Sequence, residues 1–258
     1  MTNSKQPFAG KVALVTGSTQ GLGAGIARRF AGEGAKLVLC GRSEEKGQAL
    51  KRELEESGTE VHFTSADLSN VDDCRRVVDE AMERFGRIDI LVNSAGDTRR
   101  STLENFTPDF FDYQFAVNVK APLVLAQQAL PSLKANDGVM INIGSVNAYM
   151  GGTDLLVYSA TKGALMTASR NLANALKRER VRVFGLNIGW TATDGERVIH
   201  RDLGRPDDYL DGIAAQRPLG RLLYPKDIAA VCTFLASDEA HAFSGAVIDL
   251  EQQPVGSH

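Results

Sequence analysis

The chain has 258 residues and a formal net charge of −3, because 29 Lys and Arg residues nearly balance 32 Asp and Glu residues. These charges are interspersed rather than clustered, so we do not expect a nucleic-acid-binding face. The three cysteines, Cys40, Cys74 and Cys232, are far apart and form no CxxC pair or His/Cys cluster, so neither a disulfide framework nor a metal site is predicted. No apolar run approaches about 18 residues, and residues 1–10 lack the apolar core of a signal peptide. We therefore expect a soluble, cytoplasmic protein without a membrane segment.

Short β-rich runs alternate with longer amphipathic runs along the chain. The expected strands cover residues 12–16, 36–40, 61–64, 88–92, 139–143, 181–187 and 246–250. The expected helices cover residues 22–33, 43–57, 71–85, 117–133 and 157–178, and another opens at 224–225, after an irregular stretch over 188–218. Strict alternation indicates a parallel sheet, and unbroken apolar runs are typical of strands buried on both faces. We predict an α/β fold: a Rossmann-type, doubly wound parallel sheet of about seven strands with helices on both faces.

The domain organisation is predicted to be simple. A flexible segment over residues 1–8 would precede one domain over residues 9–258, since no linker or repeat divides the chain. Ligands of doubly wound sheets bind beyond the carboxyl ends of the strands, where the strand order switches. The motifs described below fall at predicted strand ends or on the helices that follow them.

A glycine-rich turn, Thr16-Gly-Ser-Thr-Gln-Gly-Leu-Gly23, joins the first strand to the first helix. Its three glycines allow a tight turn and let backbone amides approach a pyrophosphate at the helix N-terminus. Such a triplet also occurs in plain connectors. Its position directly between a strand and a helix favours a dinucleotide-binding site.

The TGxxxGxG spacing of this turn resembles that of the short-chain dehydrogenase/reductase family, and further motifs follow in the family's order. Asn93-Ser-Ala-Gly96 matches the NNAG segment except at Ser94, and Asn118, Ser145, Tyr158 and Lys162 match the catalytic tetrad. The resemblance covers about residues 10–250 and implies an oxidoreductase that interconverts a secondary alcohol and a ketone with NAD(P)(H). The implied cofactor contacts are Gly17, Ser18, Gln20, Gly21, Leu22, Gly23, Asp67, Leu68, Asn93, Ala95, Gly96, Tyr158, Lys162, Gly189, Thr191 and Thr193.

The end of the second strand bears on which dinucleotide is used. An acidic residue there would bind the ribose 2′-hydroxyl of NAD, but this chain has Gly41 followed by Arg42. The Arg42 guanidinium suits a 2′-phosphate, to which Ser18 would add a hydroxyl. In the alternative interpretation Arg42 is solvated or stacks on adenine with either cofactor. The sequence therefore favours NADP(H), with NAD(H) as the alternative.

Tyr158 and Lys162 are four residues apart on a predicted helix, so both side chains share one face. A nearby ammonium favours the phenolate and lowers a tyrosine pKa from its usual value near 10. We assign Tyr158 as general acid/base, Lys162 as its electrostatic partner and a ribose contact, and Ser145 as a hydrogen-bond donor to the substrate oxygen. The resemblance gives Asn118 a proton relay to Lys162. The alternatives are a surface Tyr/Lys pair, a turn serine and a satisfied core amide.

Residues 190–218 are polar and charged, and we expect them to form a mobile substrate lid. Trp190 either closes the nicotinamide pocket or packs in the core, and Ile188 replaces the proline usual in the family. The charges of the lid, with Asp97 and Asn147, favour a small polar alcohol or carbonyl substrate such as a sugar or polyol, although solvated loop charges need no substrate. The family resemblance also implies a homo-oligomer, either a tetramer or a dimer.

Two other functions are compatible with parts of this sequence pattern. A catalytically silent, dinucleotide-sensing protein would have the same fold, but it has no use for a proton relay. Sugar-nucleotide epimerases and dehydratases also use Tyr and Lys, but they usually have a TGxxGxxG turn and a larger C-terminal substrate region. The sequence favours the oxidoreductase.

Overall fold

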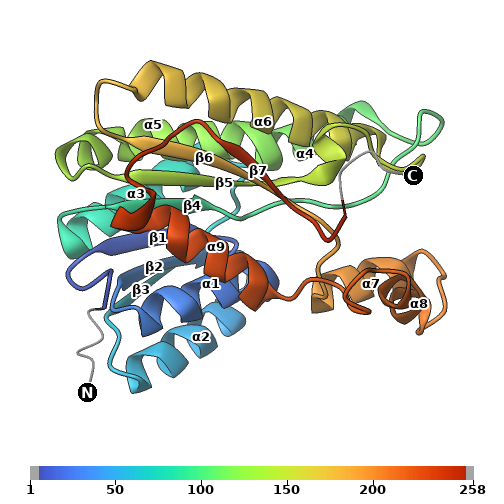
Figure 1. The fold of residues 1–258 in the computed structure, drawn as a ribbon, viewed down its shortest axis with the longest axis horizontal. Coiled ribbons are helices and arrows are strands. Elements are labelled where there is room, and N and C mark those ends of the chain that lie inside the picture. Colours follow the sequence, from blue (N-terminus) through green and yellow to red (C-terminus); the bar gives the residue numbers. More distant parts are fainter. Residues whose placement is uncertain (1–5, 254–258) are drawn as a thin grey trace.

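The computed structural model describes residues 6–253, and these contain a seven-stranded parallel sheet. The strand order is β3-β2-β1-β4-β5-β6-β7 (Figure 1), which confirms the predicted doubly wound sheet. The strands are β1 (Val12–Thr16), β2 (Lys36–Gly41), β3 (Val61–Ser65), β4 (Ile90–Asn93), β5 (Val139–Ser145), β6 (Arg182–Ile188) and β7 (Val247–Leu250). The chain returns from the β3 edge to place β4 beside β1, so the switch in strand order lies between β1 and β4.

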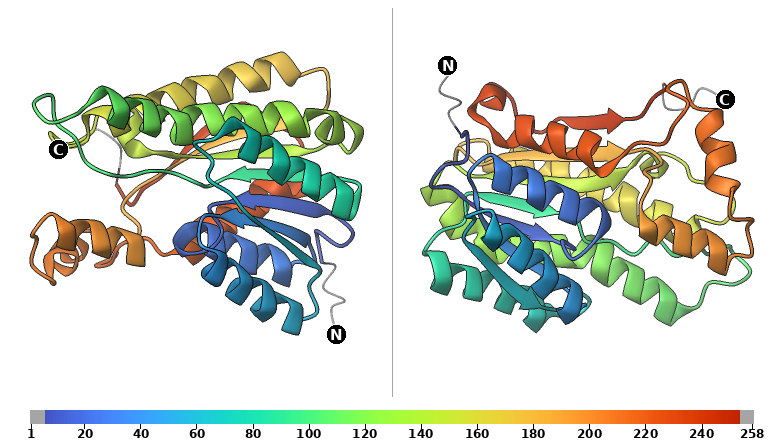
Figure 2. Two further views of the ribbon diagram at one scale, coloured as in Figure 1. Left: turned by 180° about the vertical axis from the view of Figure 1, so that it is seen from behind. Right: turned by 90° about the horizontal axis from the view of Figure 1, so that it is seen from below.

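Helices cover both faces of the sheet (Figures 1 and 2). Their bounds are α1 (Gly21–Gly32), α2 (Glu44–Glu56), α3 (Val71–Phe85), α4 (Pro108–Phe115), α5 (Ala121–Ala135), α6 (Leu156–Leu176), α7 (Asp194–Asp202), α8 (Tyr209–Ala215) and α9 (Pro225–Ala236). One core forms between the sheet and α1, α2 and α9, and a second forms between the sheet and α3, α5 and α6. Figure 1 shows α7 and α8 beyond the end of the sheet opposite the N-terminus.

Side chains of β1 alternate between the two cores. Ala13 and Val15 pack into the first core, whereas Val12 and Leu14 pack into the second, and all four are buried. Successive side chains of a strand point to opposite faces, so a run of apolar residues fills both cores at once. The carboxyl end of β1 is therefore held from both sides. Phe8 belongs to the segment over residues 1–8 that was predicted to be flexible, but it is buried and packs edge-on against Phe30. Residues 1–5 of that segment lie outside the described residues.

The helix that was predicted to begin at Val117 begins earlier and is not regular. Thr107 caps α4 by accepting a hydrogen bond from Phe110 N at 3.2 Å, and Pro108 occupies the first turn. A π-helical turn (Ala116–Lys120) then joins α4 to α5. The Thr-Pro pair was the sequence signal for the earlier start. The extra residue of the π turn breaks the regular helical period, which sequence periodicity does not reveal.

The stretch over residues 188–218, predicted to be irregular, contains α7 and α8. Thr193 caps α7 by accepting from Glu196 N at 3.2 Å, and acidic residues in the first turn complement the helix dipole. The Thr-x-x-Glu spacing, which is typical of a capping box, was the signal that the prediction missed. Both helices are short and largely exposed, so neither has a long apolar stripe that would have revealed it.

The structure also bears on disulfides, membrane-spanning helices and metal sites among the described residues. Cys40, Cys74 and Cys232 are free thiols and all are buried, and burial raises the thiol pKa of each. Over residues 6–253, none of the helices is both long and apolar enough to cross a membrane. Over the same range, no group of three or more His, Cys, Asp or Glu side chains could hold a metal ion.

The packing of α2 on β3 predicts an unusual response to alanine. In an exposed helix Gly→Ala stabilises by ~0.5–1 kcal/mol, but a methyl at Gly47 would overlap the buried Phe63 ring. We expect Gly47→Ala to lower the free energy of unfolding by about 1–3 kcal/mol. Gly32→Ala in α1, where a methyl meets nothing, is the matched control and should stabilise slightly. Denaturant unfolding of both variants measures this, and a stabilised Gly47→Ala would contradict the packing.

Candidate functional site

A cavity of about 880 Å³ opens at the carboxyl ends of the strands on both sides of the β1/β4 switch. This volume suits a small-molecule site. The predicted site residues that line it are Gly17, Gln20, Gly21, Leu22, Gly23, Arg42, Asp67, Leu68, Ala95, Gly96, Ser145, Tyr158, Lys162, Gly189, Thr191 and Thr193. Three other predicted residues, Ser18, Asn93 and Asn118, are buried behind the wall.

The glycine turn leaves no room for side chains at one end of the cavity. Gly17 and Gly21 have φ angles of 63° and 55°, the left-handed region that favours glycine. A side chain at Gly17 would overlap the Ala95 backbone, and one at Gly23 would overlap the Gly17 carbonyl group. The N-cap residue of α1, Gln20, makes no side-chain cap, so the first N–H groups of the helix stay free for an anion. This cradle fits a dinucleotide pyrophosphate.

Ser18 does not offer its hydroxyl to the cavity. Its Oγ accepts a hydrogen bond from Cys40 N at 3.0 Å and donates to the Cys40 carbonyl oxygen at 3.4 Å. Both groups belong to β2, so the hydroxyl holds the turn against the neighbouring strand. The Ser18 hydroxyl is therefore engaged by β2 and does not line the cavity, and its predicted contact with a 2′-phosphate stays a prediction.

The end of β2 has no room for an acidic side chain at Gly41. A side chain at Gly41 would overlap Thr19. Arg42 is exposed at the edge of the cavity, and its Nη1 donates to the Tyr113 hydroxyl at 3.0 Å. This bond holds the guanidinium beside α4. Arg42 thus lies at the edge of the cavity, and its contact with a 2′-phosphate stays a prediction.

The loop after β4 is fixed to the glycine turn by a hydroxyl. Thr16 Oγ1 accepts from the backbone N–H groups of Ser94 and Ala95, each at 3.0 Å. Asn93 Nδ2 donates to Asn142 Oδ1 at 2.8 Å, so Asn93 joins β4 to β5 rather than lining the cavity. Asn93 thus supports the strand ends in this structure, and its predicted contact with the cofactor stays a prediction.

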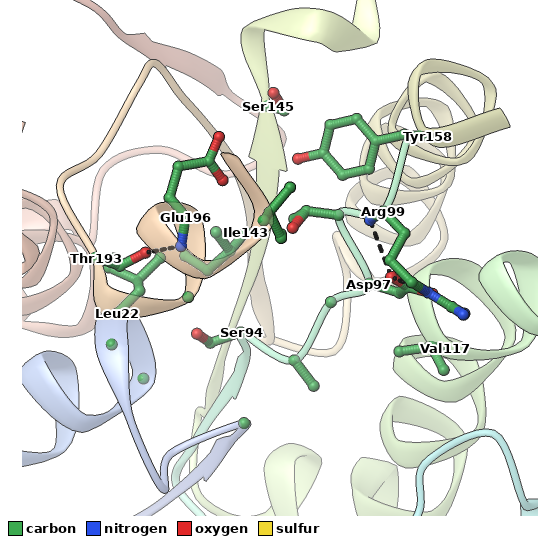
Figure 3. A pocket seen from close by; sticks show the side chains of 18 of the residues that line it. Leu22, Ser94, Asp97, Arg99, Val117, Ile143, Ser145, Tyr158, Thr193 and Glu196 are labelled. Carbon is green, nitrogen blue, oxygen red and sulfur yellow. Dashed lines mark hydrogen bonds and ion pairs between the residues drawn. The ribbon is translucent and has the colours of Figure 1, made fainter. Parts of the chain in front are cut away.

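The other end of the cavity holds a serine, a tyrosine and a lysine. Ser145 ends β5, and Tyr158 and Lys162 lie on α6; Figure 3 shows the Ser145 and Tyr158 hydroxyls turned toward the same space. Lys162 Nζ donates to the Ile143 carbonyl at 2.9 Å. Ser145 Oγ accepts from both the backbone and the side-chain amide of Asn147, each at 3.2 Å. The Ser145 hydroxyl proton is therefore left to donate toward Tyr158.

Burial controls the protonation of these groups. It raises the pKa of Tyr158 to about 12, helped by the Glu196 carboxylate and opposed by a hydrogen bond from Ser145 and by Arg100. Burial also lowers the pKa of Lys162 to about 8. The sequence predicts that Lys162 lowers the Tyr158 pKa, but in the structure desolvation of the phenolate is the largest effect and raises that pKa. At neutral pH Tyr158 therefore holds a proton that it can donate.

Asn118 lies in the π turn and is buried. Its Oδ1 accepts from Asp97 N at 2.7 Å, and its Nδ2 donates to the Asp97 carbonyl at 2.9 Å and to Thr161 Oγ1 at 3.0 Å. The side chain thus fastens the loop after β4 to α6, one residue before Lys162. The proton relay from Asn118 to Lys162 stays a prediction.

The segment after β6 forms another wall. Thr191 Oγ1 donates to the Gly189 carbonyl at 3.0 Å, and Trp190 lines the cavity while its ring packs against that of His200, with centroids 5.8 Å apart. Trp190 therefore lines the cavity and also packs against a neighbouring ring; whether it closes a nicotinamide pocket stays a prediction.

The cavity contains an ion pair that the sequence analysis did not predict. Arg100 Nη2 donates to Glu196 Oε1 at 2.7 Å, and these side chains are only 9% and 14% exposed. Both line the cavity with Tyr158. Arg100 follows β4 and Glu196 lies on α7, so no local sequence pattern pairs them. Both residues belong to charged stretches that are usually solvated.

Known proteins resemble this chain closely. Residues 11–204 match the family model described as short chain dehydrogenase. An uncharacterised oxidoreductase of Methylorubrum extorquens is 38% identical over 93% of this chain and 96% of its own length, and mouse L-fucose dehydrogenase is 37% identical over 90% and 84%. The structure of L-sorbose reductase from Gluconobacter frateurii, complexed with NADPH and L-sorbose, has a TM-score of 0.90 and 28% identity, covering 98% of this chain and 100% of that one.

The burial of Lys162 predicts a pH-dependent stability. Its pKa of about 8 in the folded chain lies below the value of 10.5 for a free side chain, so the unfolded chain binds more protons between these values. Stability from this group therefore rises with pH through that window. Between pH 8 and 10, wild type should gain on the order of 2 kcal/mol in unfolding free energy relative to Lys162→Met. Parallel urea titrations test this; a constant difference would mean that Lys162 is not desolvated.

Proposed function

Because the chain belongs to the short-chain dehydrogenase/reductase family of oxidoreductases, we propose that it interconverts a secondary alcohol and a ketone by hydride transfer with NADP(H). One observation carries this proposal. A single cavity has a side-chain-free glycine cradle at one end and the Ser145, Tyr158 and Lys162 group at the other. The first suits a pyrophosphate, and the second suits proton transfer to a substrate oxygen.

The cofactor would lie along the cavity between these ends. Gly17, Gly21 and Gly23 would hold the pyrophosphate, Asp67 and Leu68 would flank the adenine, and Arg42 would pair with a 2′-phosphate. Lys46 adds a second cation nearby, since its Nζ donates to Gln20 Oε1 at 2.6 Å. Similar structures support NADP(H): those of a metagenomic blue fluorescent protein and of L-sorbose reductase contain NADPH. NAD(H) is the alternative that Arg42 disfavours.

The side chains at the other end divide the chemistry among them. Bound NADPH supplies the hydride that reduces the carbonyl carbon. Ser145 would hold the carbonyl oxygen, and Tyr158 would donate its phenolic proton to that oxygen as the negative charge develops. Lys162, charged at neutral pH and bonded to Ile143, would stabilise the phenolate that remains. The reverse sequence oxidises the alcohol.

A small polar substrate agrees with the wall of the cavity. Arg100, Glu196 and Asn147 all line it near Tyr158. Two of the relatives are named for sugar chemistry, L-fucose dehydrogenase and L-sorbose reductase. We propose a sugar, polyol or related hydroxylated compound as the substrate class, with residues 190–218 as a lid that closes over it.

The first test concerns the cofactor. Wild type should bind NADPH at least about tenfold more tightly than NADH, since a charge-assisted hydrogen bond is worth about 1.5–3 kcal/mol. Arg42→Ala should remove most of this preference and leave NADH affinity unchanged. Arg52→Ala, an exposed arginine of α2, is the control. Fluorescence titration with both nucleotides measures the affinities, and equal binding by wild type would favour NAD(H).

The second test concerns proton transfer. Tyr158→Phe removes only the phenolic oxygen, so it should keep its NADPH affinity and lose about 10²- to 10⁴-fold in turnover. Undiminished turnover in this variant would contradict the mechanism. A wild type that binds NADPH tightly but never oxidises it with any carbonyl compound would instead support the dinucleotide-sensing alternative.

A further inference from the structure

The Arg100–Glu196 pair leaves one carboxylate oxygen for a ligand. Both donors to this carboxylate bind the same atom: Arg100 Nη2 lies 2.7 Å and His200 Nε2 lies 3.1 Å from Glu196 Oε1. Within the part of the chain that the structure describes, no group donates to Glu196 Oε2. Figure 3 shows the carboxylate turned into the cavity that Ser145 and Tyr158 also line.

The surroundings of His200 suit it to position the Glu196 carboxylate. It is buried between the rings of Trp190 and Tyr209, and its Nδ1 has no partner among residues 6–253. Because a carboxylate oxygen only accepts, His200 Nε2 is the donor in the bond to Glu196 Oε1. His200 therefore positions the carboxylate from within α7, and Arg100 positions it from across the cavity. A carboxylate held by two donors on one oxygen presents the other in a fixed direction.

Building on the proposed function, we propose that Glu196 selects substrates with a hydroxyl group beside the reacting carbon. Glu196 Oε2 is only an acceptor, so it favours a neighbouring group that donates. A hydroxyl donates; a carbonyl, an ether or a methyl does not. The ligand class is thus a neutral α-hydroxy ketone, or the corresponding vicinal diol, whose carbonyl oxygen faces Tyr158. Arg100 and His200 are positioning residues for this contact.

The charges of the site support a neutral ligand. Arg100 already compensates Glu196, and the pair is only slightly exposed. A carboxylate or phosphate on the substrate would face the free oxygen of Glu196 and be repelled. Arg99 is likewise engaged, because its guanidinium is bonded to Asp97 and lies 4.9 Å from the centroid of the Tyr113 ring. The two arginines at this end of the cavity, Arg99 and Arg100, are therefore already paired with carboxylates.

Glu196→Gln tests the proposal because it turns the group that faces the substrate from an acceptor into a donor. The amide oxygen must face Arg100 and His200, which both donate, so the amide NH₂ replaces Oε2. The probes are acetoin, diacetyl and butanone, which share a carbon skeleton but carry a hydroxyl, a carbonyl or no oxygen beside the ketone. Initial rates of NADPH oxidation give kcat/KM for each.

Wild type should use acetoin at least about tenfold better than butanone. Glu196→Gln should lower the acetoin-to-diacetyl ratio of kcat/KM by about tenfold or more, mainly through KM for acetoin. Asp194→Asn, which removes an exposed carboxylate from the same helix, is the matched control and should leave the ratio unchanged. Glu196→Asp keeps an acceptor and should keep the preference for acetoin.

For each variant, both kcat/KM values are measured on one preparation, so the fraction of folded enzyme cancels from their ratio. An equal ratio in wild type and Glu196→Gln, or a wild type that uses butanone as well as acetoin, overturns the role of Glu196 and leaves the proposed function intact. No NADPH oxidation with any of the three ketones, nor with hydroxylated ketones of the sugar class, contradicts the proposed reduction itself, and the role of Glu196 with it.

Discussion

The close approach of the glycine turn to the loop after β4 is the contact on which the rest of this protein depends. Gly17 sits so near Ala95 that any side chain would overlap its backbone, and Thr16 Oγ1 binds the N–H groups of Ser94 and Ala95. Gly17 thus leaves the space for the close approach, and Thr16 provides the hydrogen bonds that hold it. Together they fix the relative position of β1 and β4 at the strand switch, and with it the edge of the cavity.

The catalytic group is held by buried polar bonds that extend this frame. Asn118 ties the loop after β4 to α6 through Asp97 and Thr161, and Lys162 binds the end of β5 through Ile143. Burying an ammonium and a phenol has a free-energy cost, visible as opposite pKa shifts of the two groups. The two cores above and below the sheet offset that cost and hold these side chains in one arrangement before any ligand binds.

The segment after β6 is better described as a folded wall than as a charged loop. Thr193 caps α7, while Trp190, His200 and Tyr209 pack together beneath it. The Arg100–Glu196 bond then joins this wall to the loop after β4. Closure over a substrate would therefore involve an ion pair inside the site, and the same pair would help to choose the substrate.

The sequence alone predicted the doubly wound sheet, the glycine turn and the shared helix face of Tyr158 and Lys162, because these follow from local patterns: apolar runs, glycine spacing and helical periodicity. The grouping of Ser145 with these two residues was implied by the resemblance to the family's motifs. The sequence did not reveal that the Ser18 hydroxyl is used by β2, that a π turn precedes α5, or that Arg100 meets Glu196. Each of these depends on residues that are distant in the chain, or on backbone geometry that leaves no periodic pattern of apolar residues in the sequence. Local patterns predict which elements form and where ligands can bind. Only the packing of those elements decides which polar groups pair with one another and which remain free for a ligand.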